Sequence, residues 1–138
     1  MSGSTASAPN GAAQFPLDGA GEVIAIADTG IDDQHPDFGP RLKHIIPRGR
    51  RVADDPHGHG THVAGSCAGD GRASGGSLAG TAPAADIVFQ SLLDAHGGLG
   101  GLPLDLGDLF EEAYVLGARV HNNSWGAATA STYTISSS

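Results

Sequence analysis

Apolar residues in this chain gather into short runs that are separated by longer polar stretches. A nearly continuous apolar run of this length predicts a strand that is buried on both faces, as in a parallel sheet. Such a run occupies residues 22–27, and further strand candidates lie at 86–92, at 119–125 and, shorter, at 44–46. We therefore expect these four segments to pair as the strands of one sheet.

Two further segments are predicted to be helices. In one, apolar residues recur at spacings of three and four, at Leu106, Leu109, Phe110, Ala113 and Leu116. Asp105 is the expected N-cap of this helix, and Gly117 is the expected stop. Residues 59–68 are mostly small and favour a tightly packed helix, although Gly60 and Gly65 each cost about 1 kcal/mol relative to Ala. Alternating strands and helices predict an α/β fold with a parallel sheet.

Length and charge narrow the class of protein. The 138 residues make one ordinary domain, in which we expect residues 1–20 to form a flexible arm or linker and residues 21–138 to fold. A net charge of −8 argues against nucleic acid as a partner. No apolar stretch approaches the roughly 20 residues that span a bilayer, and the first ten residues lack the regions of a signal peptide. Cys67 is alone, which excludes an internal disulfide.

Two motifs carry the chemistry. Asp28-Thr29-Gly30 follows the first predicted strand, at the carboxyl end where open α/β sheets place their working residues. His59-Gly60-Thr61-His62 opens the first predicted helix. A serine nucleophile needs an imidazole as its base, and the other ring nitrogen of that imidazole needs a buried acid. Asp28 and His59 have the side chains for the acid and the base.

In this order along the chain, residues 24–32 and 57–65 resemble the Asp and His blocks of subtilisin-like serine proteases, peptidase family S8. The resemblance covers about residues 20–135 and looks closest to the alkaline, oxidant-tolerant bacterial members. It implies the N-terminal part of a three-layer parallel-sheet subtilisin-like fold. It also implies a secreted, extracellular endopeptidase that hydrolyses peptide bonds through an acyl-enzyme. Asp28 would be the orienting acid and His59 the base.

The resemblance further implies a cleft with two rails that hold an extended peptide substrate between them. One rail is expected at Ser124, Trp125 and Gly126, and the opposite rail at Gly98, Gly100 and Gly101. Trp125 would line a pocket for an apolar side chain of the substrate, although an ordinary buried Trp is the alternative reading.

Two blocks of the family pattern do not occur in the 138 residues. They are the Gly-Thr-Ser-Met-Ala-type block with the nucleophilic serine and the segment with the oxyanion-hole asparagine. We expect a C-terminal half of the peptidase domain to supply both as a partner, and the chain alone to be inactive.

No cofactor is expected for the chemistry itself. Calcium is a candidate structural ion, because Asp37 matches a position that ligates calcium in many family members. One carboxylate is not a site, since Ca²⁺ takes six to eight oxygen ligands.

Two other functions stay open. His57, His59 and His62 have the spacing of a zinc-hydrolase motif, but Thr61 stands where that motif requires Asp, and the Asp28 segment is left unexplained. The family reading instead makes His62 a packed structural residue. The third candidate is a non-catalytic module that binds peptides or assembles with a partner.

Overall fold

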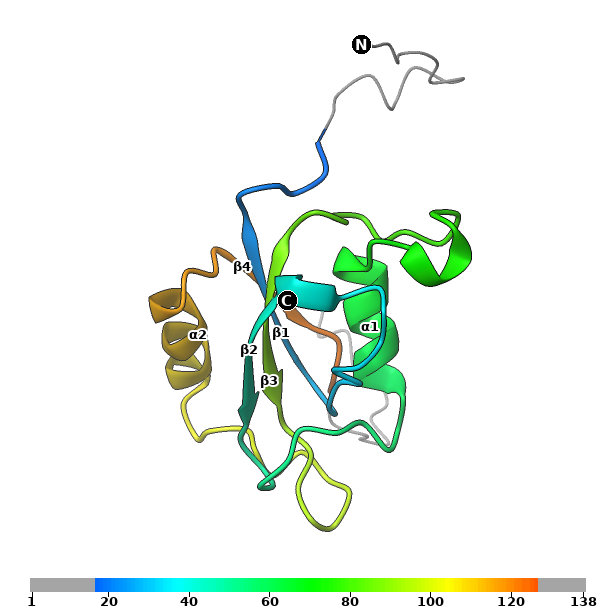
Figure 1. The fold of residues 1–138 in the computed structure, drawn as a ribbon. Helices are drawn as coiled ribbons and strands as arrows, with labels where there is room; N and C mark the ends of the chain where they lie inside the picture. The colour runs from blue at the N-terminus through cyan, green and yellow to red at the C-terminus, as the bar shows by residue number, and fades with distance from the viewer. Residues whose placement is uncertain (1–16, 127–138) are drawn as a thin grey trace, which may run out of the picture.

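The computed structural model describes residues 17–126, and Figure 1 shows how they fold. In chain order the elements are β1 (Val23–Asp28), η3 (Gly39–Arg41), β2 (Leu42–Pro47), α1 (His59–Ala68), η4 (Arg72–Ser74), β3 (Asp86–Ser91), α2 (Leu106–Val115) and β4 (Val120–Asn123). The predicted strands and helices are confirmed. Most of the predicted arm lies outside the described residues, as do residues 127–138. Within the part described, every helix is too short or too polar to cross a membrane.

The strands form one parallel sheet in the order β2-β3-β1-β4. β1 pairs with β3 from Val23↔Asp86 to Asp28↔Ser91. On its other side β1 pairs with β4 up to Ala27↔Asn123. The carboxyl ends of these three strands therefore lie at the same edge of the sheet, with β1 in the middle.

Helices cover both faces of the sheet, which confirms the predicted α/β class. Figure 1 shows α1 and α2 on opposite sides of the strands. Successive residues of a strand point to opposite faces. Ile26 thus packs with Ala64 and Ala68 of α1, whereas Ala25 packs with Ala113 of α2. This two-sided burial explains why the sequence of β1 is apolar without alternation.

The apolar stripe of α2 is wider than the surface it buries. Leu109 and Ala113 are fully buried, but Leu106 and Phe110 each keep about 40% of their surface exposed. Phe110 instead lies edge-on to the ring of His121 on β4, with 4.8 Å between the ring centroids. The predicted helix is correct, but only part of its predicted face is core.

The two glycines of α1 differ in their surroundings. A Cβ on Gly60 would overlap the carbonyl oxygen of Gly30, so close packing does explain this glycine. A Cβ on Gly65 would meet nothing within 4 Å among the described residues. Among residues 17–126, tight packing therefore explains Gly60 but not Gly65.

Candidate active site

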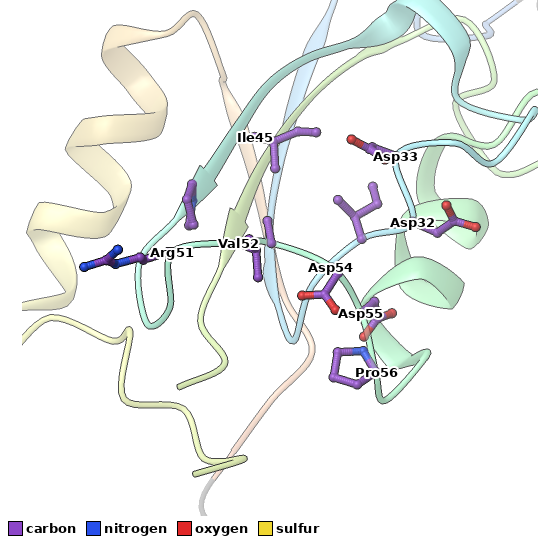
Figure 2. A pocket seen from close by; sticks show the side chains of 11 residues that line it. Asp32, Asp33, Ile45, Arg51, Val52, Asp54, Asp55 and Pro56 are labelled. Atoms are coloured by element: carbon purple, nitrogen blue, oxygen red, sulfur yellow. The ribbon is translucent and has the colours of Figure 1, made fainter. Parts of the chain in front are cut away.

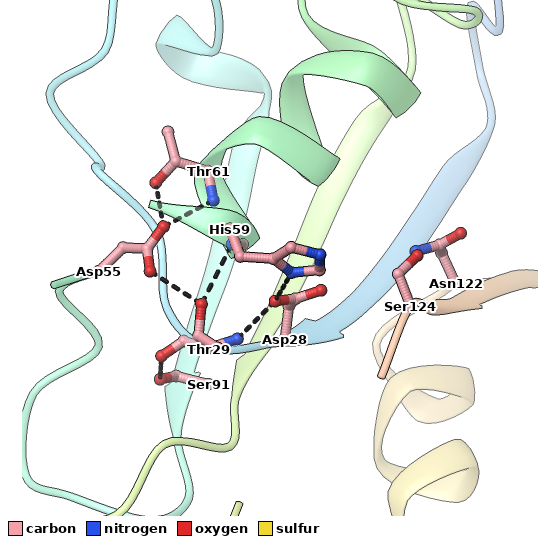
Figure 3. Close-up of polar contacts among 9 residues, drawn as sticks. Asp28, Thr29, Asp55, His59, Thr61, Ser91, Asn122 and Ser124 are labelled. Carbon is pink, nitrogen blue, oxygen red and sulfur yellow. Dashed lines mark hydrogen bonds and ion pairs between the residues drawn. The ribbon is translucent and has the colours of Figure 1, made fainter. Parts of the chain in front are cut away.

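The side chains of Asp28 and His59 meet at the carboxyl edge of the sheet. Asp28 is the last residue of β1 and its side chain is 1% exposed. His59 is the first residue of α1 and its ring is 54% exposed. Nδ1 of His59 lies 2.8 Å from Oδ1 of Asp28, and Figure 3 shows the ring turned toward the carboxylate. The fold thus brings together the two residues that the sequence motifs single out.

The direction of this hydrogen bond decides which ring nitrogen holds the proton. An ionised carboxylate only accepts hydrogen bonds, and Asp28 Oδ1 also accepts the N–H of Thr29 at 2.8 Å. Nδ1 of His59 is therefore the donor, and the neutral ring keeps its lone pair on Nε2. The hydrogen bond to Asp28 raises the pKa of His59, and the charge of Asp28 adds to this. Slight burial opposes the rise, and the charge of Asp55 contributes a little to it.

Glycine backbones allow the strand end and the helix start to approach this closely. Gly60, directly after His59, has no room for a side chain because the Gly30 carbonyl oxygen occupies that space. A Cβ on Gly30 would in turn overlap the carbonyl oxygen of Asp54. Both glycines are therefore required by space, and their contact sets how near the imidazole lies to the carboxylate.

Asp55 organises the same junction, although no sequence motif distinguishes it. Its Oδ1 accepts the hydroxyl of Thr29 at 2.8 Å. Its Oδ2 accepts the hydroxyl of Thr61 at 2.7 Å and the Thr61 N–H at 2.8 Å. Burial raises the pKa of Asp55, but these bonds and one from the Gly58 N–H outweigh it, so the pKa lies below its ordinary value. Figure 3 shows this network beside the Asp28–His59 pair.

The two predicted rails lie on either side of Asp28. Because β1 lies between β3 and β4, the segments that leave those two strands flank its carboxyl end. Leu99 and Leu102 of the first segment and Trp125 of the second pack on one small cluster of buried residues. The two segments thus share one cluster, and a groove between them stays a prediction.

The side chain of Asp94 organises the rail at Gly98, Gly100 and Gly101. The carboxylate of Asp94 accepts three backbone N–H groups of the loop, from His96, Gly98 and Gly100, at 2.8, 2.9 and 3.1 Å. These bonds, that from Gly98 first, lower the pKa of Asp94. A Cβ on Gly101 would lie 2.8 Å from the carbonyl oxygen of Leu92. Gly98, Gly100 and Gly101 thus form a tight loop, and their contact with substrate stays a prediction.

The rail at Ser124, Trp125 and Gly126 is partly exposed. Ser124 and Gly126 are on the surface, and Ser124 Oγ accepts the side-chain N–H of Asn122 at 2.9 Å. Trp125 is half-buried against Ala27, Leu92 and Leu109. Its Nε1 is buried and has no hydrogen-bond partner among residues 17–126. Trp125 therefore belongs to the edge of the core, and its role in a substrate pocket stays a prediction.

An acidic pocket of about 700 Å³ lies beside the junction. Figure 2 shows Asp32, Asp33, Asp54 and Asp55 around it, with Arg51 at one side. Asp28 and His59 are not part of its lining. The pocket is thus a neighbour of the candidate active site and not the place where the imidazole acts.

Comparison with known proteins decides the family. The sequence model of the subtilase family matches residues 19–138, which include both motifs and every helix and strand that the structure describes. This chain belongs to the subtilase family. Its parallel sheet with helices on both faces agrees with the predicted subtilisin-like fold.

Several curated subtilases are similar to this chain. The serine protease/ABC transporter B family protein tagB of Dictyostelium discoideum is 35% identical over 137 residues, which cover 86% of this chain and 7% of that protein. Fervidolysin of Fervidobacterium pennivorans is 33% identical over 123 residues, covering 78% and 17%. The major intracellular serine protease of Bacillus subtilis (strain 168) is 38% identical over 87 residues, covering 56% and 25%. This chain therefore matches only a minor part of each of these subtilases.

The zinc alternative finds no support in the geometry of this subtilase chain. Within residues 17–126, no three His, Cys, Asp or Glu side chains are grouped to hold a metal ion. Nδ1 of His59 is bonded to Asp28, and His57 and His62 are both exposed. Within residues 17–126 the packing expected for His62 is not seen, and it stays a prediction. His62 lies on α1 along an apolar hollow of about 580 Å³.

Asp37, the candidate calcium ligand, binds the backbone of a nearby loop. Its Oδ1 accepts the N–H of Ala73 at 2.7 Å, and its carbonyl oxygen accepts the N–H of Asp70 at 2.9 Å. The short helix η4, within the loop that follows α1, is thus anchored to Asp37. A calcium ion at Asp37 stays a prediction.

Proposed function

We propose that this chain supplies the acid and the base of a subtilisin-type serine endopeptidase. The observation that carries the proposal is the 2.8 Å hydrogen bond between Asp28 and His59, with Nδ1 as donor. Nε2 of His59 would take the proton of a serine hydroxyl as that oxygen attacks a peptide carbonyl. Asp28 would hold the ring in the required tautomer and stabilise the imidazolium that forms. His59 would then return the proton to the leaving amine, and water would hydrolyse the acyl-enzyme.

The serine and the oxyanion-hole asparagine would come from a C-terminal half of the peptidase domain. Two observations support such a partner. Oδ2 of Asp28 is buried and has no hydrogen-bond donor among residues 17–126. The hollow beside α1 is mostly apolar and is lined by Val63, Cys67 and Val120, of which Val120 is 59% exposed. Both features fit a surface that another segment covers.

The substrate would be an extended peptide that lies between the two rails. Main-chain hydrogen bonds to a strand-like substrate give affinity without sequence preference, and side-chain pockets add selectivity. Ser124, Trp125 and Gly126 on one side, and Gly98, Gly100 and Gly101 on the other, are the proposed binding residues. An extracellular location stays a prediction, because one of the similar subtilases is named an intracellular protease.

The test combines this chain with the C-terminal half of a related subtilase domain. A fluorescent phosphonate that reacts with activated serines should label the added half only when both parts are present. The variant His59→Ala should abolish this labelling. The matched control His57→Ala, an exposed histidine two residues away, should leave it unchanged.

Each competing function gives a different result. A soluble, assembled complex that is not labelled would contradict the protease proposal. Peptide binding without labelling would favour the non-catalytic module. Hydrolysis that is lost both with a chelator and in His57→Ala would favour the zinc enzyme.

A further inference from the structure

Helix α1 begins without a capping side chain of its own. Its N-cap is Gly58, which has a left-handed backbone (φ 78°) and offers no hydroxyl or carboxylate. The first N–H groups of a helix have no partner inside the helix and need acceptors from elsewhere. Thr29 Oγ1 accepts the N–H of Gly60 at 3.1 Å, and Asp55 Oδ2 accepts the N–H of Thr61 at 2.8 Å. The start of α1 is therefore capped by two other segments of the chain.

The charge of Asp55 fixes the direction of every bond in this cap. A carboxylate only accepts, so the hydroxyls of Thr29 and Thr61 must both donate to it. Each hydroxyl oxygen then presents its lone pairs to a backbone N–H. Thr29 accepts from Gly60 at 3.1 Å, and Thr61 accepts from Asp32 at 2.9 Å. One ionised side chain thus orients two hydroxyls and three backbone groups.

This bridge runs beside the Asp28–His59 hydrogen bond. Thr29 directly follows Asp28, and Gly60 directly follows His59, so the Thr29–Gly60 bond joins the same two segments one residue further along. We propose that Asp55 is a positioning residue of the catalytic pair, which acts through Thr29 to hold the imidazole of His59 on the carboxylate of Asp28. This inference rests on the proposed function of the pair.

Asp55 also acts on His59 through its charge. The charged groups that act on the ring are Asp28, at the end of β1, and Asp55, in the loop before α1, and both raise its pKa. Removal of the Asp55 charge should therefore lower the pKa of His59 even if no atom moves. The experiment has to separate this effect of charge from an effect on position.

The first measurement is made on the whole 138-residue chain. Nitrogen-15 NMR spectra of the imidazole report the tautomer and the pKa of His59 directly. In the wild type, Nδ1 should carry the proton of the neutral ring. Asp55→Asn, which keeps the shape but loses the charge, should lower the pKa and raise the share of the Nε2–H tautomer. The matched control Asp54→Asn should change neither, because the neighbouring Asp54 is 67% exposed and pairs with Arg50.

Variants of Thr29 separate position from charge. Thr29→Val removes the bridge to Gly60 but leaves Asp55 ionised. It should raise the share of the Nε2–H tautomer, whereas Thr29→Ser, which keeps a hydroxyl, should restore the wild-type tautomer. Because this pair of variants does not touch Asp55, it also decides the question if Asp55→Asn fails to fold.

The second measurement is the pH profile of the enzyme assembled with a C-terminal half. Asp55→Asn should reduce kcat/KM by about 10- to 100-fold even above the acidic limb, as expected for a misplaced base. The acidic limb itself should move to lower pH. If the wild-type assembly is inactive, the proposed function fails, while the NMR result still tests the position of the ring.

Three outcomes would overturn the inference. The first is a tautomer that does not change in Asp55→Asn. The second is a tautomer that does not change in Thr29→Val, which would leave only an effect of charge. The third is a lower melting temperature in either variant with His59 unaffected, which would make Asp55 a structural cap and nothing more.

Discussion

The two α-helices within residues 17–126 begin in different ways, although they have the same length and a similar first turn. Each has ten residues, and each has a glycine in its second position, Gly60 in α1 and Gly107 in α2. In α2 the side chain of the N-cap, Asp105, accepts the N–H of Gly107 at 2.8 Å. In α1 the N-cap is a glycine, and acceptors from Thr29, directly after β1, and from the loop before α1 replace it. The same physical need is met locally in one helix and by distant residues in the other.

This difference follows from what each start has to do. A local cap stabilises a helix but leaves its orientation to the packing of its apolar face. A cap supplied by another segment also ties the first turn to that segment. In α1 the first residue is His59, whose ring must meet the carboxylate at the end of β1. The first turn of α1 is thus held by Thr29, the residue next to Asp28. Asp28 is the hydrogen-bond partner of His59, the first residue of the helix.

The largest expected effect is a loss of activity when the first residue of α1 is replaced, with almost no loss when the first residue of α2 is replaced. His59→Ala removes the base and should lower kcat/KM of the assembled protease by at least about 10⁴-fold. Leu106→Ala, at the first position of α2, should leave kcat/KM within about twofold, because Leu106 is remote from the pair and 41% exposed. Hydrolysis of a peptide substrate measures both. If the His59→Ala variant kept most of its activity, the start of α1 would have no catalytic role that distinguishes it from the start of α2.

The second prediction compares alanine at the two glycines. Gly60→Ala places a methyl group on the Gly30 carbonyl oxygen and should lower the free energy of unfolding by about 1–3 kcal/mol. The atom nearest to the added methyl of Gly107→Ala would be Oδ1 of the movable Asp105 carboxylate, at 3.0 Å. Since Ala is a better helix former than Gly by about 1 kcal/mol, Gly107→Ala should be neutral or stabilising. Urea unfolding of both variants measures the difference. Equal effects would show that the two glycines have equal room for a side chain.

The third prediction concerns the local cap. Asp105→Ala should lower the free energy of unfolding by about 1 kcal/mol, because the Gly107 N–H loses its acceptor. The same variant should not change the tautomer of His59, which no residue of α2 contacts through a hydrogen bond. A change at His59 in the NMR spectrum would show that the two helix starts are coupled.

The smallest expected effect is a dependence of stability on pH. Asp28 raises the pKa of His59 in the folded state above the ordinary value of about 6.5. The stability gained from the pair is therefore fully present below about pH 6.5 and lost as the pH rises through the raised pKa. Because the ring is half-exposed, the change should be small.

The measurement is the difference in unfolding free energy between the wild type and Asp28→Asn, followed from about pH 5.5 to 9. This difference cancels the contribution of His121. Burial lowers the pKa of His121, and its bond to Asn123 has a smaller, opposing effect. His121 alone would act with the opposite sign, since its neutral form is favoured in the fold. A difference that does not fall with rising pH would contradict the raised pKa of His59.

The parts of this structure that depend on neighbouring residues could be predicted from the sequence. The strand expected at residues 22–27 is β1, Val23–Asp28, because burial on both faces leaves an unbroken apolar run. The cap of α2 could be predicted because Asp105 and Gly107 are two residues apart. The Asp28 and His59 motifs were equally visible, since each is a short continuous pattern.

Features that depend on distant residues could not be predicted. Asp55 bonds to Thr29, 26 positions away, and in the sequence it is one of several acids in a loop. No pattern of periodicity or spacing distinguishes it from Asp54 beside it. The family resemblance predicts a packed His62, but that side of α1 is open within the described part of the chain.

The central place of β1 in the sheet also bears on when the catalytic pair can form during folding. Its two neighbours, β3 and β4, both come much later in the chain, with Val23 facing Asp86 and Ile24 facing Val120. Pairing between such distant segments is slow, and it comes after local structure has formed. The acid therefore reaches its final position only once the sheet has closed around it. A nascent or partly folded chain holds an ordinary aspartate and an ordinary histidine, and the reactive pair is a late product of folding.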